Sequence, residues 1–293
     1  MKKLLSLALI LVLTFSFASC VDVSETGTDK NPSTGGNTTP SDKTEVTLSE
    51  KVIFNQNDVE ITVTGMDYSG FFGPSVKVLI ENNSQKNLTV QTRDSSVNGA
   101  MIETIFSEDI AAGKKANSSI VFAENELKTA GIQTIKNIEF KIYLFDTESY
   151  DDVATSETIT LTTSADVSFD QIFDKSGETL YDEDGIKVIA KKLSSRDSFW
   201  GSELYLYIEN NTEENITIQT KDVSINGFMV DPVFSCEILS GKVAFSSVTF
   251  LESDLTDNGI EDITELELKL NIFNKETWDD IKDTDIIKIS FNG

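Results

Sequence analysis

Residues 76–99 read VKVLIENNSQKNLTVQTRDSSVNG, and residues 204–227 read LYLYIENNTEENITIQTKDVSING. Half of the 24 positions are identical, and the two stretches are 128 residues apart. The same spacing holds without a gap to about residue 163. Self-similarity at one fixed spacing is typical of a duplicated structural unit. We therefore expect two copies of one domain, the first copy at residues 46–164 and the second copy at residues 165–293.

The repeated stretch has the pattern of paired β-strands. Val76, Val78 and Ile80 form an apolar set with a spacing of two, which places them on one face of a strand. The stretch closes on Asn98-Gly99, the preferred pair for a two-residue type I′ turn, because both turn positions need a positive φ. The pattern predicts a β-meander in each copy.

The second strand of the stretch follows the same rule. Leu88 and Val90 are predicted to point inward, and Thr89, Gln91 and Arg93 outward. Further strands of the first copy are predicted at residues 52–54, 59–63, 102–106, 118–122, 138–144 and 159–161, with one helical turn that ends at a glycine, at 124–131. About seven or eight short strands between frequent turns favour an antiparallel immunoglobulin-like β-sandwich in each copy.

The N-terminus has the pattern of a targeting signal. Basic residues at positions 2 and 3 precede a mostly apolar run at residues 4–17, and Ala18-Ser19-Cys20 follows. This resembles the bacterial lipoprotein signal, in which the chain is cut before the cysteine and the cysteine thiol receives diacylglycerol. The resemblance implies a signal peptide at residues 1–19, a lipid on Cys20 and an extracytoplasmic protein anchored to the cell membrane. A retained membrane anchor and an ordinary secretory signal are the alternatives.

A polar linker follows the cysteine. Residues 21–43 are rich in Ser, Thr, Gly, Asn and Pro and hold almost no large apolar side chain. Such a segment buries too little apolar surface to order itself. We expect residues 20–45 to be a flexible spacer between the lipid and the sandwiches.

Composition excludes several classes of function. The chain has 49 acidic and 24 basic residues and a net charge of -25, which repels nucleic acid. It has no histidine, so histidine-based catalysis and the usual zinc sites are excluded. Lipid on Cys20 would leave Cys236 without a disulfide partner, and we expect Cys236 to be a buried, unreactive thiol. We expect no cofactor and no catalysis.

Aromatic residues mark one candidate contact site. Phe72-Gly73 and Trp200-Gly201 occupy matching loops before the repeated stretch, and Phe199 precedes Trp200. An aromatic ring at a loop tip can stack on a sugar or pack against a partner protein. It can equally plug the open end of a sandwich. Phe72, Phe199 and Trp200 are therefore the predicted contact residues.

Acidic turns are the candidates for a metal site. The turn after the strand at 138–144, and the matching turn of the second copy, contain paired aspartates, and so does the predicted first hairpin of the second copy. Carboxylates at this density are suited to Ca²⁺, but the EF-hand spacing is missing, and acids solvated in turns explain them equally well. The metal candidates are Asp182, Asp184, Asp279 and Asp280.

Several short motifs recur in both copies: IENNS/T, QT-x-D, S-x-NG, GK and L-x-x-x-GI. Over residues 50–291 this pattern resembles the tandem immunoglobulin-like domains in surface lipoproteins of clostridia and their relatives. The resemblance implies the fold and a location at the cell surface, and that family has no established activity.

The sequence favours an adhesion or recognition module of the cell envelope. Its partner would be an envelope protein or a glycan, bound through the aromatic loops or exposed strand edges, in addition to the membrane bound through the lipid. A carbohydrate-binding accessory or an envelope-associated enzyme component that uses the acidic clusters is the alternative. A purely structural spacer is a third hypothesis.

Overall fold

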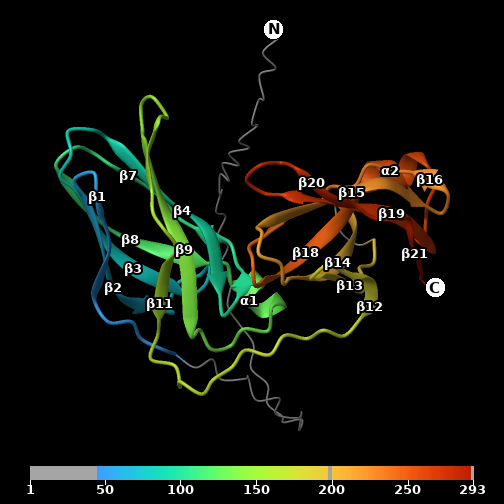
Figure 1. The fold of residues 1–293 in the computed structure, drawn as a ribbon, viewed down its shortest axis with the longest axis horizontal. Coiled ribbons are helices and arrows are strands. Elements are labelled where there is room, and N and C mark those ends of the chain that lie inside the picture. The colour runs from blue at the N-terminus through green and yellow to red at the C-terminus, as the bar shows by residue number, and fades with distance from the viewer. Residues whose placement is uncertain (1–44, 197–199, 292–293) are drawn as a thin grey trace, which may run out of the picture. The chain divides into compact units, whose positions relative to one another are not determined.

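The computed structural model of the chain describes residues 45–196 and 200–291. Figure 1 shows that the regular structure of the described chain is mainly β-strand, and each copy also contains one short helix. The elements of the first copy are β1 (Lys51–Gln56), β2 (Val59–Asp67), β3 (Ser75–Asn82), β4 (Leu88–Val97), β5 (Ala100–Met101), β6 (Thr104–Ile105), β7 (Ser107–Ile110), β8 (Lys114–Phe122), α1 (Glu124–Thr129), β9 (Asn137–Asp146), β10 (Asp152–Thr155) and β11 (Ile159–Thr162).

The second copy repeats this order of elements, except that an isolated bridge between Val233 and Thr249 takes the place of β6. It contains β12 (Glu178–Glu183), β13 (Ile186–Leu193), β14 (Gly201–Asn210), β15 (Ile216–Ile225), β16 (Phe228–Met229), β17 (Ser235–Ile238), β18 (Lys242–Leu251), α2 (Glu252–Asp257), β19 (Glu265–Asn274), β20 (Asp280–Asp283) and β21 (Ile287–Ser290).

Each copy consists of two antiparallel sheets. In the first copy one sheet has the order β1-β2-β3-β8-β6, and the other is built on β10-β9-β4-β5 with β7 on β4 and β11 on β9. In the second copy β12-β13-β14-β18 form one sheet, and β16-β15-β19-β20 form the other with β17 and β21. The predicted all-β, immunoglobulin-like sandwich fold is confirmed. The predicted boundary at 164/165 lies between β11 and β12 and stays a prediction.

The predicted inward residues form the core of the first copy. Val76, Val78, Ile80, Leu88 and Val90 are each at most 1% exposed. They come from both sheets and belong to one buried apolar cluster, and the second copy has a cluster of its own. The alternation in the sequence therefore identified the core correctly.

Thr89 departs from the predicted pattern. Gln91 and Arg93 are partly or fully exposed, as predicted, whereas Thr89 is buried. Thr89 is buried because β4 is a central strand whose neighbours cover this position. Its hydroxyl is 2.6 Å from Asp109 Oδ1 and 3.0 Å from Thr147 Oγ1. The prediction that Thr89 points to solvent was wrong.

The predicted strand at residues 102–106 is also wrong. The chain forms two short strands instead, β5 pairing with β4 and β6 pairing with β8, so it crosses from one sheet to the other. Ile102 lies in the crossing, is buried, and donates its backbone N–H to the Ser95 carbonyl at 3.2 Å. A single strand cannot serve both sheets, and the alternating pattern does not reveal the switch.

The predicted turn and helix are confirmed. Asn98 and Gly99 have φ of 51° and 89°, and the matching Asn226 and Gly227 have 51° and 84°. Helix α1 ends at Thr129 with Ala130 as its C-cap, and Gly131 follows with φ of 68°. The Gly131 N–H donates to the Lys128 carbonyl and the Ile132 N–H to the Leu127 carbonyl, the two bonds of a Schellman C-terminus.

Candidate functional site

The predicted aromatic contact residues lie at the surface. Phe72 is 64% exposed and Trp200 is 66% exposed. These rings therefore do not plug the end of a sandwich, and that alternative interpretation is wrong. Phe71, next to Phe72, is 93% exposed and meets it edge to face with 5.2 Å between ring centroids. Phe199 and Cys20 lie outside the described residues.

A glycine behind each ring fixes the loop to the core. Gly73 has φ of 136°, and a Cβ atom there would stand 2.2 Å from the carbonyl oxygen of Phe122. Gly201 has φ of 112°, and its Cβ would stand 2.0 Å from the carbonyl oxygen of Phe250. The loop approaches the end of β8 or β18 so closely that only glycine fits.

The backbone carbonyls of Phe72 and Trp200 also bind the first residues of helices α1 and α2. The backbone carbonyl of Phe72 accepts a hydrogen bond from the Glu124 N–H at 3.0 Å, at the first residue of α1. The carbonyl of Trp200 accepts from the Glu252 N–H at 3.1 Å, at the first residue of α2. Each exposed ring is thus attached to a backbone that is tied to both a strand and a helix.

In the second copy an ion pair adds to this attachment. Arg196 donates from Nε to Glu252 Oε2 at 2.6 Å and from Nη2 to Glu252 Oε1 at 2.5 Å. The bidentate hydrogen bonds from Arg196 hold the pKa of the Glu252 carboxyl below its usual range. Arg196, three residues after the end of β13, is thereby joined to α2.

A second pair of exposed aromatic residues lies at the hairpins between β9 and β10 and between β19 and β20. Tyr150 is 75% exposed and Trp278 is 71% exposed. Both have a positive φ, 61° and 64°, which is uncommon for a bulky residue. These turns were predicted as candidate metal sites from their aspartates; their aromatic residues were not predicted as contacts, although the match between the two copies is visible in the sequence.

Each of these rings stacks on a neighbour from the preceding strand. The centroids of Tyr150 and Phe145 are 6.1 Å apart with 22° between the ring planes. Trp278 and Phe273 are 5.5 Å apart with 20° between their planes. The same offset stack therefore supports an exposed ring in both copies.

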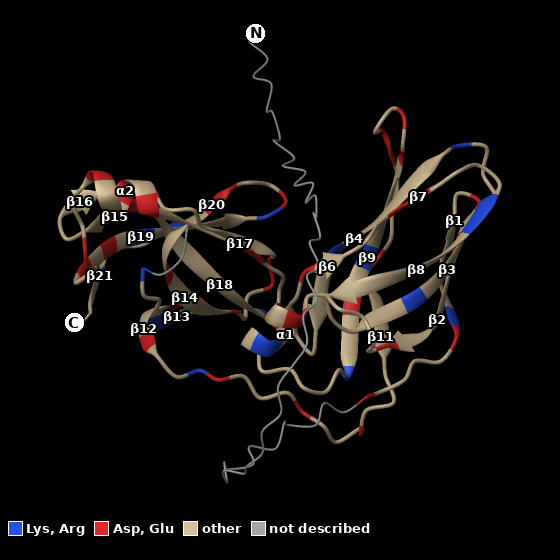
Figure 2. Cartoon of the chain, turned by 180° about the vertical axis from the view of Figure 1, so that it is seen from behind, with Lys and Arg blue, Asp and Glu red and all other residues tan. Residues whose placement is uncertain are grey.

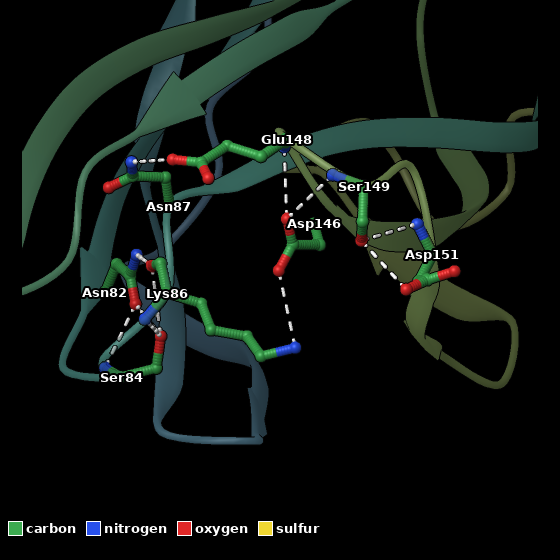
Figure 3. Close-up of polar contacts among 8 residues, drawn as sticks. All are labelled: Asn82, Ser84, Lys86, Asn87, Asp146, Glu148, Ser149 and Asp151. Atoms are coloured by element: carbon green, nitrogen blue, oxygen red, sulfur yellow. Dashed lines mark hydrogen bonds and ion pairs between the residues drawn. The ribbon is translucent and has the colours of Figure 1, made fainter.

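Side-chain hydrogen bonds hold the hairpin of the first copy in shape (Figure 3). Asp146 Oδ1 accepts from the backbone N–H groups of Glu148 at 3.0 Å and Ser149 at 3.1 Å. These N–H groups lower the pKa of the Asp146 carboxyl, and Lys86 lies 3.3 Å from its other oxygen. Asn87 Nδ2 donates to Glu148 at 3.3 Å, which ties the hairpin to the β3–β4 turn.

Asn274 takes the place of Asp146 in the second copy. Its Oδ1 accepts from the backbone N–H groups of Glu276 and Thr277, both at 2.9 Å. Asn215 Nδ2 donates to Glu276 at 2.8 Å, matching the bond from Asn87. Different side chains thus build the same turn under Tyr150 and Trp278.

The metal candidates do not converge. In Figure 2 acidic residues are spread over many strands and turns of both copies. Within residues 45–196 and 200–291, no three carboxylate or cysteine side chains form a group that could hold a metal ion. Asp182 is 2.8 Å from Lys187 Nζ, and Asp280 accepts from Asn271 Nδ2 at 3.3 Å. Asp184 and Asp279 are exposed in turns.

Cys236 is buried and makes no disulfide. Burial raises the pKa of its thiol to about 12, so the reactive thiolate does not form near neutral pH. The predicted buried thiol is confirmed. In the described part of the chain, no helix has the length and apolar character needed to cross a membrane.

Comparison with known proteins assigns no family. No family model and no curated protein matches the chain. Among solved structures, the SafA pilin in complex with the SafB chaperone from Salmonella enterica matches with 10% identity and a TM-score of 0.21, over 74% of this chain and 89% of that one. The YadV chaperone matches with 13% identity and a TM-score of 0.23, over 74% of this chain and 92% of that one. Similarity this low says nothing about what the chain binds.

Proposed function

We propose that the chain is a non-catalytic binding module of the bacterial cell envelope, anchored to the membrane by a lipid on Cys20. The N-terminal signal and the small residues before Cys20 support the anchor. One acyl chain holds a protein only marginally in a membrane, whereas two or more hold it stably. The polar segment at residues 21–43 then gives the domains reach from the membrane surface.

The matched exposed aromatic residues carry this proposal. Phe72 and Trp200 lie at one pair of equivalent loops, and Tyr150 and Trp278 at another, all more than 60% exposed. Large aromatic side chains dominate the energetics of interfaces, and most of the surface of these four rings faces solvent. Their backbones are fixed by the same contacts in both copies, so the rings meet a partner with little loss of backbone entropy. The partner is an envelope protein or a glycan.

Catalysis has little chemical support in the described residues. The chain has no histidine, and the Cys236 thiol stays protonated. Burial raises the pKa of the Glu126 carboxyl. Glycoside hydrolysis by the carboxylate mechanism requires a pair of facing carboxyl groups, and the pKa of one of them must be raised. A binding role is therefore the better supported function.

The experiment compares binding of the full chain to purified cell-wall glycan and to isolated envelope proteins. A variant with alanine at Phe72, Trp200, Tyr150 and Trp278 should lose most of the binding and stay folded, with a melting temperature lowered only by the loss of the two ring stacks. The control carries Val167→Ala and Ile172→Ala, two exposed apolar residues outside the strands, 89% and 88% exposed. Unchanged binding by the aromatic variant would contradict the proposal.

A further inference from the structure

Three Asn-Gly pairs lie in the described part of the chain, and they begin at Asn98, Asn226 and Asn258. The pair at residues 292–293 lies outside the described residues. An asparagine before glycine is chemically prone to lose ammonia, because glycine has no side chain to hinder attack by its own main-chain nitrogen on the asparagine amide. The three pairs share this chemistry and differ in how the fold holds them.

The amide group of Asn98 is held on both of its polar atoms. Its Nδ2 donates to the carbonyl of Thr134 at 2.7 Å. Its Oδ1 accepts from the backbone N–H groups of Lys136 at 2.8 Å and Asn137 at 3.0 Å. The side chain must break these bonds before its Cγ can turn to the nitrogen of Gly99.

The amide group of Asn226 is held in the same way in the second copy. Its Nδ2 donates to the carbonyl of Asp262 at 2.8 Å. Its Oδ1 accepts from the backbone N–H groups of Thr264 and Glu265, both at 3.0 Å. Asn98 and Asn226 are therefore both protected by their place in the fold.

Asn258, the C-cap residue of α2, is held on one side only. Its Nδ2 donates to the carbonyl of Asp254 at 2.8 Å, whereas its Oδ1 accepts no hydrogen bond within residues 45–196 and 200–291. Asn258 is partly exposed and Gly259 is exposed. The Gly259 N–H donates to the carbonyl of Thr256 at 3.0 Å, so this bond must also open before the nitrogen can attack.

The end of α2 can open at little cost in free energy. The helix has six residues and no side-chain cap at its N-terminus. Helices this short are marginal, and helix ends fray readily. Asn98 and Asn226 lie instead in tight turns whose flanking residues are paired in a sheet. The reactive conformation is therefore easier to reach at Asn258.

The first copy shows that the fold does not require an asparagine at this position. Ala130 occupies the place of Asn258 and is the C-cap of α1. The φ and ψ angles are -75° and -4° at Ala130 and -93° and 2° at Asn258. The same helix end thus forms with a residue that has no amide to lose, and only the second copy carries the reactive pair.

We propose that Asn258 is a site of spontaneous deamidation. The main-chain nitrogen of Gly259 loses its proton to water and attacks Cγ of Asn258. The N–Cγ bond forms, the Cγ–Nδ2 bond breaks, and Nδ2 leaves as ammonia, which gives a cyclic succinimide. Water then opens the ring. Cleavage of the new bond gives aspartate, and cleavage of the original peptide bond gives isoaspartate. This modification goes beyond the proposed binding function and does not depend on it.

Both products change the end of α2. Each adds a negative charge at the helix C-terminus, where the helix dipole disfavours it. Isoaspartate also lengthens the main chain before Gly259, which shifts the Gly259 N–H away from the carbonyl of Thr256. The Ile260 N–H, which donates to the carbonyl of Leu255 at 2.8 Å, shifts with it. Since Arg196 donates to the carbonyl of Ile260, the change extends to the residue that joins β13 to α2.

The test incubates the full chain at neutral and mildly alkaline pH and follows each pair by mass spectrometry of tryptic peptides. Asn98, Asn226 and Asn258 fall in separate peptides, residues 94–114, 222–242 and 243–269, and none of these contains another asparagine or a glutamine. Asn258 should deamidate at least about tenfold faster than the other two, because more hydrogen bonds must break at the two β-turns. The rate should rise with pH, because attack requires a deprotonated nitrogen.

Unfolding provides the control for local sequence. In guanidinium chloride the three pairs should react at similar rates, because the contacts that distinguish them are gone. An Asn258 that reacts no faster than Asn98 and Asn226 in the folded chain overturns the proposal. A preference for Asn258 that is equally large in denaturant also overturns it, since the neighbouring residues and not the fold would then be the cause.

Matched variants test the effect on α2. The isoaspartate form, separated from aged protein, should melt at a lower temperature than both the fresh chain and Asn258→Asp, which carries the charge without the longer main chain. Asn258→Ala introduces the residue of the first copy, and its melting temperature should not change with age. An equal loss on ageing in Asn258→Ala would overturn the assignment of the damage to this pair.

Discussion

Gly73 and Phe122 are in backbone contact: a Cβ atom on Gly73 would stand 2.2 Å from the Phe122 carbonyl oxygen. The equivalent approach of Gly201 to Phe250 is 2.0 Å. No side chain fits between backbones at this separation. The loop with the exposed aromatic residue is therefore fixed to a core strand in both copies, and any substitution at the glycine forces the two apart.

Gly73→Ala should lower the free energy of unfolding by about 2 kcal/mol or more, since it combines a clash with an unfavourable φ. Denaturant unfolding measures the loss. Gly99→Ala is the control, because Gly99 also has a positive φ, 89°, but its Cβ would meet nothing within 4 Å. Equal losses in the two variants would show that the close approach to Phe122 has no energetic weight.

Tyr181→Phe should stabilise the second copy, by about 1 kcal/mol, because it removes a buried hydroxyl that has no partner. Tyr207→Phe provides the contrast. Tyr207 is fully buried, but its hydroxyl donates to Glu209 Oε1 at 2.8 Å, so its removal should destabilise by a similar amount. The melting temperatures of the two variants should therefore move in opposite directions. A lower melting temperature for Tyr181→Phe would mean that the hydroxyl has a partner.

The sequence predicted the core well because burial follows the strand period. Val76, Val78 and Ile80 lie on one strand with one buried face, which alternation reports directly. Thr89 was misplaced because its burial comes from side chains on other strands. The crossing at Ile102 was missed for a related reason: whether a strand continues in one sheet depends on which partner lies beside it.

The candidate site was predictable in position but not in exposure. Matching aromatic residues at 72 and 200 were visible, but the sequence could not say whether a ring on a loop points to the core or to solvent. The unpartnered hydroxyl of Tyr181 was harder to foresee. Tyr181 and Phe54 are similar aromatic residues in a strand, and only the position of the hydroxyl relative to its neighbours distinguishes them.

The stability that Asp146 contributes in the β9–β10 hairpin should decrease at acidic pH. The backbone N–H groups of Ser149 and Glu148 lower the pKa of Asp146 from 3.8, so its stabilising contribution is present above that value and is lost as pH falls through the lower folded-state pKa. Asp146→Asn introduces the residue that the second copy has at position 274, which accepts the same bonds without titrating. The difference in unfolding free energy between wild type and Asp146→Asn should shrink between pH 7 and pH 3. A difference that stays constant over this range would show that the carboxylate charge plays no part.

The lipid anchor has a direct test. Cys20→Ala removes the thiol that would receive the lipid, so the protein should leave the membrane fraction and should no longer incorporate labelled fatty acid. Cys236→Ala is the matched control, since the Cys236 thiol is buried and should leave the distribution unchanged. A Cys20→Ala protein that stays in the membrane fraction would rule out attachment through this lipid.

Tyr150 offers a test of why an aromatic residue occupies a strained turn position. At φ of 61° glycine is favoured over alanine by about 1 kcal/mol. Stacking on Phe145 stabilises tyrosine at this position by about 0.5–1.5 kcal/mol. Tyr150→Gly should therefore leave the unfolding free energy nearly unchanged, whereas Tyr150→Ala loses the stack, keeps the strain and should be about 1 kcal/mol less stable. Both variants should bind the envelope partner equally weakly, because both lack the ring. If Tyr150→Gly instead destabilises the protein as much as Tyr150→Ala, the ring serves the fold, and the hairpin is a structural turn and not a contact site.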